Sequence, residues 1–395
     1  MLTSYRRVLS EPGTLRFSAT GLVARLPISM VGLGIVLLVS AATGSYAVAG
    51  AVSAAYMIAN AGLAILQGRL LDTLGQGRVL AATSIGFAVA MVLLVWTVEA
   101  GWPVAWSYAC AALAGAVLPQ VGSAVRARWS HVLDAERDVQ TAYAIEAVAD
   151  EAVFMLGPII VTVLATAWDP VAGIAVAVLA CTTGTLALCA QRATEPPAHP
   201  HHRASGRRLR MPWATVAPLA VVSAALGTLF GAAEVTTVAF ATEQHHQAWA
   251  GGLLALWALG SMLAGVLTGA ITWRRGPSVR VRWGAFGMFC AMVPLHFVGS
   301  VPLMGLVLLI GGFAIAPTLI ATLSLTESTV PPGRLTEGMA ILHTGIVAGV
   351  APGASVAGLV VDHSGASAAY AVALVGGLLG ALAAQAARPA PSLRT

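Results

Sequence analysis

The sequence predicts an all-α integral membrane protein with twelve transmembrane helices in two six-helix bundles. Only 9% of the 395 residues are charged and 58% are apolar, whereas about a quarter of the residues in a soluble domain are charged. The chain contains no lysine, and its 21 arginines, apart from Arg25, lie in terminal segments and in or at the edges of every second gap between long apolar runs. The positive-inside rule produces this alternation in a chain that crosses a bilayer many times.

Sidedness follows from the same alternation. Six gaps carry no arginine, and we expect them on the outer side: the region of Ser45 and residues 99–103, 168–170, 243–247, 299–302 and 362–365. The arginine-bearing gaps and both termini are then cytoplasmic, which predicts a multi-pass protein of the cell membrane. Arginines in short cytoplasmic loops fit contact with anionic membrane lipids, so no nucleic-acid partner is expected.

Twelve apolar runs reach the length of about 20 residues that a bilayer core requires. They cover residues 17–40, 46–67, 78–98, 104–126, 141–167, 171–189, 213–240, 249–272, 283–298, 302–325, 336–360 and 367–387. The first run is too long for the apolar region of a cleavable signal peptide, so we interpret it as the first span. Cysteines lie within or at the edge of these runs without paired spacing, as small core residues do.

One long polar stretch divides the chain into two halves. We therefore predict an N-terminal bundle over 1–190, a cytoplasmic linker over 191–212 and a C-terminal bundle over 213–395. Three prolines in the linker preclude a continuous helix. Its three histidines, His199, His201 and His202, have no carboxylate or cysteine at a suitable spacing, so we expect a solvated linker, no metal site and no cofactor.

The two halves repeat some local features. The fourth span contains Gly115-Ala-Val-Leu-Pro119, and the tenth contains Gly312-Phe-Ala-Ile-Ala-Pro317 at the matching place. Parallel six-helix repeats predict a binding site between the halves near the membrane midplane.

Four prolines and one glycine are expected to shape these helices: Pro119, Gly157, Pro158, Pro317 and Pro352. A proline inside a span frees a carbonyl group, which is tolerated where the helix faces a cavity or another helix.

The gap between the second and third spans reads Gly68-Arg-Leu-Leu-Asp72-Thr73-Leu-Gly75-Gln-Gly-Arg78. It resembles the signature loop of the major facilitator superfamily, G-x-x-x-D-R-x-G-R-[RK], with threonine at the position of the first arginine. The resemblance extends over nearly the whole chain through the twelve spans, the basic central loop and the half-repeats. It implies that this loop is cytoplasmic and helps to stabilise the outward-facing state. Asp72 is expected to accept hydrogen bonds from free amides at the start of the next helix or from an arginine.

Ionisable groups inside a membrane are expensive and are candidates for function. The fifth span carries Glu146, Asp150 and Glu151, and the first span carries Arg25. Glu146 and Asp150 share a helix face, and Asp150 lies roughly 14 Å from the cytoplasmic start of its helix. We expect a pair of Arg25 with Asp150 or Glu151, which is either a static link between two helices or a site that changes protonation during transport. Glu146 is shallower and is expected to reach the headgroups.

Other polar residues are candidates for the cavity. In the family fold, spans one, four, seven and ten line the cavity, and this resemblance adds Gln120, Glu234 and Thr318 to Arg25 as candidates. Glu234 is either a second functional acid or a residue of the outer interface. His343, in the eleventh span, is expected to be a structural or a titrating histidine.

A further pair of arginines, Arg126 and Arg128, ends the fourth span and is expected to anchor it at the cytoplasmic surface.

The resemblance implies a secondary active transporter that moves a small, amphipathic solute by alternating access. We expect a monomer that exports its solute with coupling to protons; an importer or a uniporter of the same fold remains open. Other classes are a membrane sensor without transport and a membrane-embedded enzyme. The chain has no H-E-x-x-H motif and no P-loop, so an enzyme is not expected.

Overall fold

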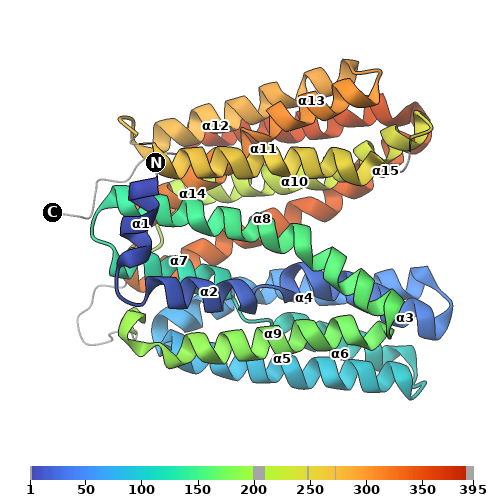
Figure 1. Cartoon of the computed structure of the whole chain (residues 1–395), viewed down its shortest axis with the longest axis horizontal. Coiled ribbons are helices and arrows are strands. Elements are labelled where there is room, and N and C mark those ends of the chain that lie inside the picture. Colours follow the sequence, from blue (N-terminus) through green and yellow to red (C-terminus); the bar gives the residue numbers. More distant parts are fainter. Residues whose placement is uncertain (1, 199–209, 247–248, 272, 388–395) are drawn as a thin grey trace. The chain divides into compact units, whose positions relative to one another are not determined.

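The computed structural model describes residues 2–198, 210–246, 249–271 and 273–387. Its described residues form helices joined by short connections, and no strand occurs among them (Figure 1). The histidines of the linker lie outside the described residues. The all-helical architecture confirms the predicted fold class.

The described residues of the first half of the chain form nine α-helices. They are α1 (Leu2–Ser10), α2 (Thr14–Ala24), α3 (Pro27–Thr43), α4 (Tyr46–Leu74), α5 (Gln76–Glu99), α6 (Val104–Ala116), α7 (Val121–Val132), α8 (Glu136–Ala167) and α9 (Pro170–Ala190), followed by the short 3-10 helix η1 (Arg192–Thr194). The second half contains α10 (Trp213–Glu243), α11 (Ala250–Ala270), α12 (Pro277–Met292), η3 (Pro294–Phe297), α13 (Val301–Gly312), α14 (Ile315–Thr329), η4 (Pro332–Arg334) and α15 (Leu335–Ala386).

These helices account for the twelve predicted spans. The first span is divided into α2 and α3, the fourth into α6 and α7, and the tenth into α13 and α14. The eleventh and twelfth spans form α15, which is interrupted at Gly365 by a backbone φ of 83°. A positive φ favours glycine, which has no Cβ atom to clash with the backbone.

The breaks within the spans have local causes. Pro27 has no amide hydrogen to donate back into α2, so α2 ends at Ala24 and α3 begins at the proline, although Arg25 and Leu26 keep right-handed helical backbone angles. Pro119 interrupts the fourth span in the same way, between Ala116 and Val121. Pro317, in contrast, lies in the first turn of α14, where a helix tolerates proline, and the break precedes it.

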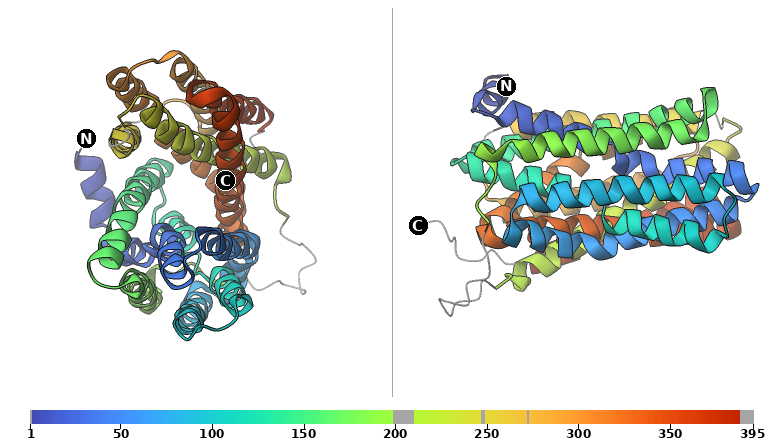
Figure 2. Two further views of the ribbon diagram at one scale, coloured as in Figure 1. Left: turned by 90° about the vertical axis from the view of Figure 1, so that its right-hand side faces the viewer. Right: turned by 90° about the horizontal axis from the view of Figure 1, so that it is seen from below.

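The chain divides into two compact units. The first unit contains residues 9–132 and 149–208, and the second unit contains residues 1–8, 133–148 and 209–395. Within each unit, the long helices run roughly alongside one another (Figure 2). Helix α8 contributes its first part, up to residue 148, to the second unit and its remainder to the first unit.

The unit of residues 9–132 and 149–208 has an apolar core formed by α3, α4, α5, α6, α8 and α9, with Phe87 and Met91 fully buried. A glycine permits close packing of α4 and α6, because a Cβ atom at Gly115 would lie 1.9 Å from the carbonyl oxygen of Tyr56. The other unit repeats this contact: a Cβ atom at Gly312 of α13 would lie 2.2 Å from the carbonyl oxygen of Trp257 of α11. The matching glycines of the two halves therefore serve the same packing purpose.

The N-terminal helix α1 packs on the second unit. The Tyr5 hydroxyl donates a hydrogen bond to the carbonyl oxygen of Val266 at 2.6 Å, and Arg7 forms an ion pair with Asp138 near the start of α8. Thr141 of α8 donates to the carbonyl oxygen of Gly269 at 2.9 Å. Residues 133–148 are therefore a structured part of this unit, tied to the end of α11.

Tryptophans mark the turn between α5 and α6. The rings of Trp96 and Trp102 are 5.0 Å apart, and those of Trp102 and Trp106 are 5.9 Å apart. Aromatic rings of this kind gather where a membrane meets water, which agrees with a turn at the membrane surface.

Candidate functional site

An ion pair between the first and fifth spans forms the centre of the candidate site. The Arg25 guanidinium donates from Nη1 to Oδ1 of Asp150 at 2.7 Å and from Nε to the Gly21 carbonyl oxygen at 3.1 Å. Arg25 lies in the short break between α2 and α3, so its side chain leaves the helix axis at the point where the backbone turns. Its side chain is 1% exposed, whereas that of Asp150 is 30% exposed.

A second arginine contacts the same carboxylate. Arg126 of α7 donates from Nη2 to Oδ2 of Asp150 at 2.5 Å and from Nη1 to the carbonyl oxygen of Gly122 at 3.1 Å. A Cβ atom at Gly122 would lie 3.1 Å from Arg126 Nη1 and 3.6 Å from Arg25 Cδ. This glycine therefore leaves room for both guanidinium groups, and Asp150 joins the first, fourth and fifth spans.

The role expected of Arg126 in the sequence analysis is therefore incomplete. Its position near the cytoplasmic end predicts a surface anchor, but its long side chain folds back into the unit and is only 12% exposed. The available sequence signal is Gly122, four residues earlier on the same helix face, where a missing side chain gives an arginine space to fold back.

The helices that carry the cluster also touch through small residues. The Ser29 hydroxyl of α3 donates to the Val153 carbonyl oxygen of α8 at 2.8 Å. A Cβ atom at Gly157 would lie 1.9 Å from Ser29 Oγ. Gly157 thus allows α8 to approach α3 closely, while α8 continues as a helix through Pro158.

The remaining acids of the fifth span differ in exposure. Glu146 is completely buried within the protein, in the part of α8 that belongs to the second unit, so its side chain does not extend to the headgroups as expected. Glu151 is half-buried and lies next to Asp150 along the chain.

The signature loop forms a sharp turn between α4 and α5. Gly75 has a φ of 93°, which explains glycine at this position. Gly68 and Asp72 are buried, and Arg78 is exposed. The backbone amide of Gly77, in the first turn of α5, donates to Oε1 of Glu195 at 2.7 Å. A carboxylate at a helix N-terminus is stabilised by the free amides and the helix dipole, and here the acid comes from the segment after η1.

The anchoring role predicted for Arg128 is contradicted by its burial. Its side chain is fully buried and donates from Nε to Oε1 of Gln76 at 2.8 Å and from Nη1 to the Gln191 carbonyl oxygen at 2.8 Å. It also contacts the hydroxyl of Thr194 at 3.1 Å. Arg128 therefore fastens the segment after the sixth span to the start of α5. Its partners are distant in sequence, so spacing alone does not reveal them.

Polar side chains of α4 form hydrogen bonds with residues at the break in the fourth span. Gln67 donates to the Ala116 carbonyl oxygen at 2.7 Å. Gln120, which is 5% exposed, donates to Oδ1 of Asn60 at 3.0 Å and to the Leu118 carbonyl oxygen at 3.3 Å. The carbonyl groups freed around Pro119 are thus partly satisfied within the unit.

The other cavity candidates lie in the second unit. Glu234 is exposed on α10 and forms no hydrogen bond or ion pair with another described residue. Thr318 is fully buried, donates to the Ala314 carbonyl oxygen at 2.7 Å and faces Gly284 of α12, where a Cβ atom would lie 2.5 Å from its hydroxyl oxygen. His343 is half-buried in the first part of α15. Pro352 lies in the same helix, which continues through it.

Among the residues that the structure describes, no group of three or more histidine, cysteine, aspartate or glutamate side chains is placed to hold a metal ion.

One protein-family model matches the chain. The family profile described as Major Facilitator Superfamily matches residues 17–333. No curated protein sequence matches the chain.

Several solved structures share the fold. The human organic anion transporter MFSD10 (TETRAN) is 17% identical with a TM-score of 0.72 and covers 95% of this chain and 100% of its own. A bacterial homologue of the iron transporter ferroportin is 14% identical with a TM-score of 0.75, over 94% and 98%. A variant of the E. coli fucose:proton symporter FucP is 12% identical with a TM-score of 0.66, over 95% and 98%.

Proposed function

This chain belongs to the Major Facilitator Superfamily, and we propose that it is a secondary active transporter that exports a small amphipathic solute in exchange for protons. The observation that carries the proposal is the contact of Asp150 with both Arg25 and Arg126. An ionised carboxylate within a membrane needs compensation by nearby positive charge. Protonation of Asp150 would remove the negative charge that compensates two guanidinium groups.

Such a change would act on three helices together. Arg25 lies at the break of the first span, Arg126 lies in α7 of the fourth and Asp150 lies in α8 of the fifth. Losing the shared carboxylate weakens the charge-assisted hydrogen bonds that hold these helices in one arrangement. A transporter that alternates between two arrangements can use this difference, because a bound proton shifts the equilibrium only if it interacts differently with the two states.

The partial exposure of Asp150 supports the same assignment. Its side chain is 30% exposed while Arg25 beside it is 1% exposed. A proton can therefore approach the carboxylate without separating the Arg25 side chain from its surroundings. Glu234 of α10 has no hydrogen-bond or ion-pair partner among the described residues. It is the second candidate for a proton-carrying group, because an isolated carboxyl group within a membrane is costly when it is ionised.

The solute class rests on composition. Aromatic residues make up 6% of the chain, which is a low content for a site that stacks sugar rings. A cavity with aliphatic walls and few polar groups suits an amphipathic solute. The named relatives are an organic anion transporter, a homologue of an iron transporter and a fucose:proton symporter, so the test covers several solute classes.

Transport by the purified protein in proteoliposomes tests the proposal. Under an imposed pH gradient with an acidic interior, labelled drugs, amino acids and sugars are offered outside. We expect at least one amphipathic solute to accumulate, and we expect Asp150→Asn or Glu234→Gln to abolish the pH-driven component. Glu99→Gln is the matched control, because it neutralises an exposed acid outside the membrane core.

Each other outcome contradicts a stated part of the proposal. Accumulation driven only by an acidic exterior would identify an importer. Solute equilibration without any effect of pH would identify a uniporter. If pH-driven transport survives both substitutions, neither carboxyl group couples it to protons.

A further inference from the structure

A groove lies along the second unit between α12 and the pair α13–α14. Its volume is about 710 Å³, and its middle part is lined by Trp283, Ile310 and Phe313. Trp283 and Ile310 are each 62% exposed. Large apolar side chains that are this exposed are in contact with hydrocarbon in a membrane protein, so the groove is accessible to lipid tails.

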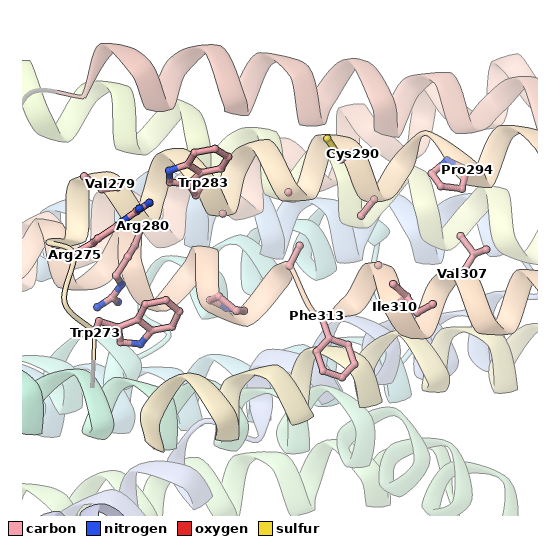
Figure 3. A pocket seen from close by; sticks show the side chains of 16 residues that line it. Trp273, Arg275, Val279, Arg280, Trp283, Cys290, Pro294, Val307, Ile310 and Phe313 are labelled. Carbon is pink, nitrogen blue, oxygen red and sulfur yellow. The ribbon is translucent and has the colours of Figure 1, made fainter. Parts of the chain in front are cut away.

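Positive charge gathers at one end of this groove. Figure 3 shows Arg275, Arg280 and Trp273 at one end of the groove and Pro294 and Val307 at the other. The charged end belongs to the connection between α11 and α12, which the arginine distribution places on the cytoplasmic side. The groove thus runs from the inner headgroup region into the hydrocarbon.

Arg280 has unused capacity to bind an anion. Its Nη1 donates to Oε1 of Gln140 at 2.7 Å, and its guanidinium lies over the Trp273 ring at 5.1 Å. The residue is only 7% exposed, and its Nη2 is buried without a hydrogen-bond partner among the described residues. An unpaired donor of a charged group is among the more expensive features to bury.

The nearby acid does not take this place. Glu136 lies close enough to interact electrostatically with Arg280, but it forms no ion pair with Arg280 among the described residues and accepts a hydrogen bond from Gln140 at 3.3 Å instead. Arg275, the second cation of the groove, is exposed. Within the described part of the chain, the charged end therefore has no carboxylate bound directly to it.

We propose that the groove binds an anionic phospholipid of the inner leaflet, with its phosphate at Arg275 and Arg280 and one acyl chain along α12. From Val279 to Pro294 the groove follows 16 residues of helix and turn, or about 22 Å at the rise of an α-helix. This length exceeds half of a hydrocarbon core of about 30 Å, so it accommodates the chain of one leaflet. Arginine forms paired hydrogen bonds with phosphate oxygens, which supplies the missing partner of Nη2.

Site-specific fluorescence quenching tests this proposal without a transport assay. Cys290 lines the groove and is exposed, while Cys110 and Cys181 are buried. With Cys189→Ser in the background, a bimane on Cys290 reports quenching by phospholipids with brominated acyl chains. We expect a brominated phosphatidylglycerol to compete against unlabelled phosphatidylcholine more strongly than brominated phosphatidylcholine does, by about fivefold for each contributing arginine.

Three charge variants separate a defined site from general attraction to the surface. Arg280→Gln is expected to lower the preference for the anionic lipid about fivefold, and Arg280→Lys is expected to retain most of it. Arg274→Gln is the matched control, because it removes the same charge one residue before Arg275 and outside the groove lining. An equal loss in the control would overturn the proposal, as would equal quenching by the two lipids in the unsubstituted protein.

A fourth variant separates the acyl chain from a free phosphate ion. A Cβ atom at Gly287 would lie 3.8 Å from Ala314 Cβ, so Gly287→Leu projects into the groove without touching the arginines. We expect it to remove the preferential quenching by the anionic lipid. If inorganic phosphate competes with the brominated lipid in both Gly287→Leu and the unsubstituted protein, the site recognises phosphate alone and the lipid assignment is wrong.

Discussion

Asp150 forms ion pairs with two guanidinium groups. Each substitution in the cluster therefore removes a different number of ion pairs. Arg25 is almost completely buried and pairs with one oxygen, while Arg126 pairs with the other and is 12% exposed. Removing the shared carboxylate leaves both cations beside each other, whereas removing Arg126 preserves the Arg25–Asp150 pair. The three side chains should therefore differ in their contributions to stability.

We expect Asp150→Asn to destabilise the protein by about 2 kcal/mol, less than the roughly 3–5 kcal/mol for breaking a fully buried pair, because Asp150 is 30% exposed. Arg126→Gln should cost about 1 kcal/mol. Combining the two should cost less than their sum, since both changes remove the same contact between Arg126 and Asp150. Thermal unfolding of the purified variants in detergent measures these differences, and strictly additive losses would contradict the shared-carboxylate arrangement.

Between elements, glycine contacts set the helix spacing in the second unit. On α10, Cβ atoms at Gly227 and Gly231 would lie 1.9 and 2.0 Å from carbonyl oxygens of α15. On α15, Cβ atoms at Gly349 and Gly353 would lie 2.0 and 2.2 Å from carbonyl oxygens of α10. Both pairs have the four-residue spacing that places small residues on one helix face and lets transmembrane helices pack closely.

Gly349→Leu should therefore force α10 and α15 apart. Overpacking of this kind costs about 1–3 kcal/mol, so we expect the thermal midpoint to fall by about 5 °C. Gly358→Leu on the same helix is the matched control, because a Cβ atom there would meet only Val235 Cγ1 at 4.0 Å. Equal midpoints for the two variants would show that close packing at Gly349 is dispensable.

The whole molecule depends on its threading through the membrane, which remains a prediction of the arginine distribution. At two glycines, an added Cβ atom would meet no other atom within 4 Å. Gly276 lies in an arginine-rich connection between predicted spans, and Gly299 lies in a connection without arginine. Each can therefore carry a cysteine without disturbing the fold.

In a Cys290→Ser background, we expect a membrane-impermeant thiol reagent to label Gly299→Cys in intact cells. Gly276→Cys should react only after the cells are permeabilised, because the positive-inside rule places arginine-rich connections in the cytoplasm. The background protein without either new cysteine provides the blank. Labelling of Gly276→Cys from outside would invert the threading and, with it, the side from which protons reach Asp150.

Family membership and the fold class could be read from the sequence because they depend on local properties. A run of about 20 apolar residues forms a helix in lipid wherever it occurs, since no other structure satisfies its backbone groups. The connection that contains Gly75 was expected from its resemblance to the signature loop, whereas the break before Pro27 was not predicted, because the apolar run over residues 17–40 continues through the proline. The depth of the acidic residues along their helix also limited the expected partner of Arg25 to Asp150 or Glu151.

Tertiary structure decided the rest, because a contact between two helices depends on their rotation and axial position. The sequence predicts surface anchors at Arg126 and Arg128, but packing turns one toward Asp150 and buries the other between Gln76 and Gln191. It predicts Glu146 at the headgroups, yet the beginning of α8 packs in the second unit and buries it. Apolar length is a property of one segment, whereas the partner of a charged side chain is a property of the helices around it.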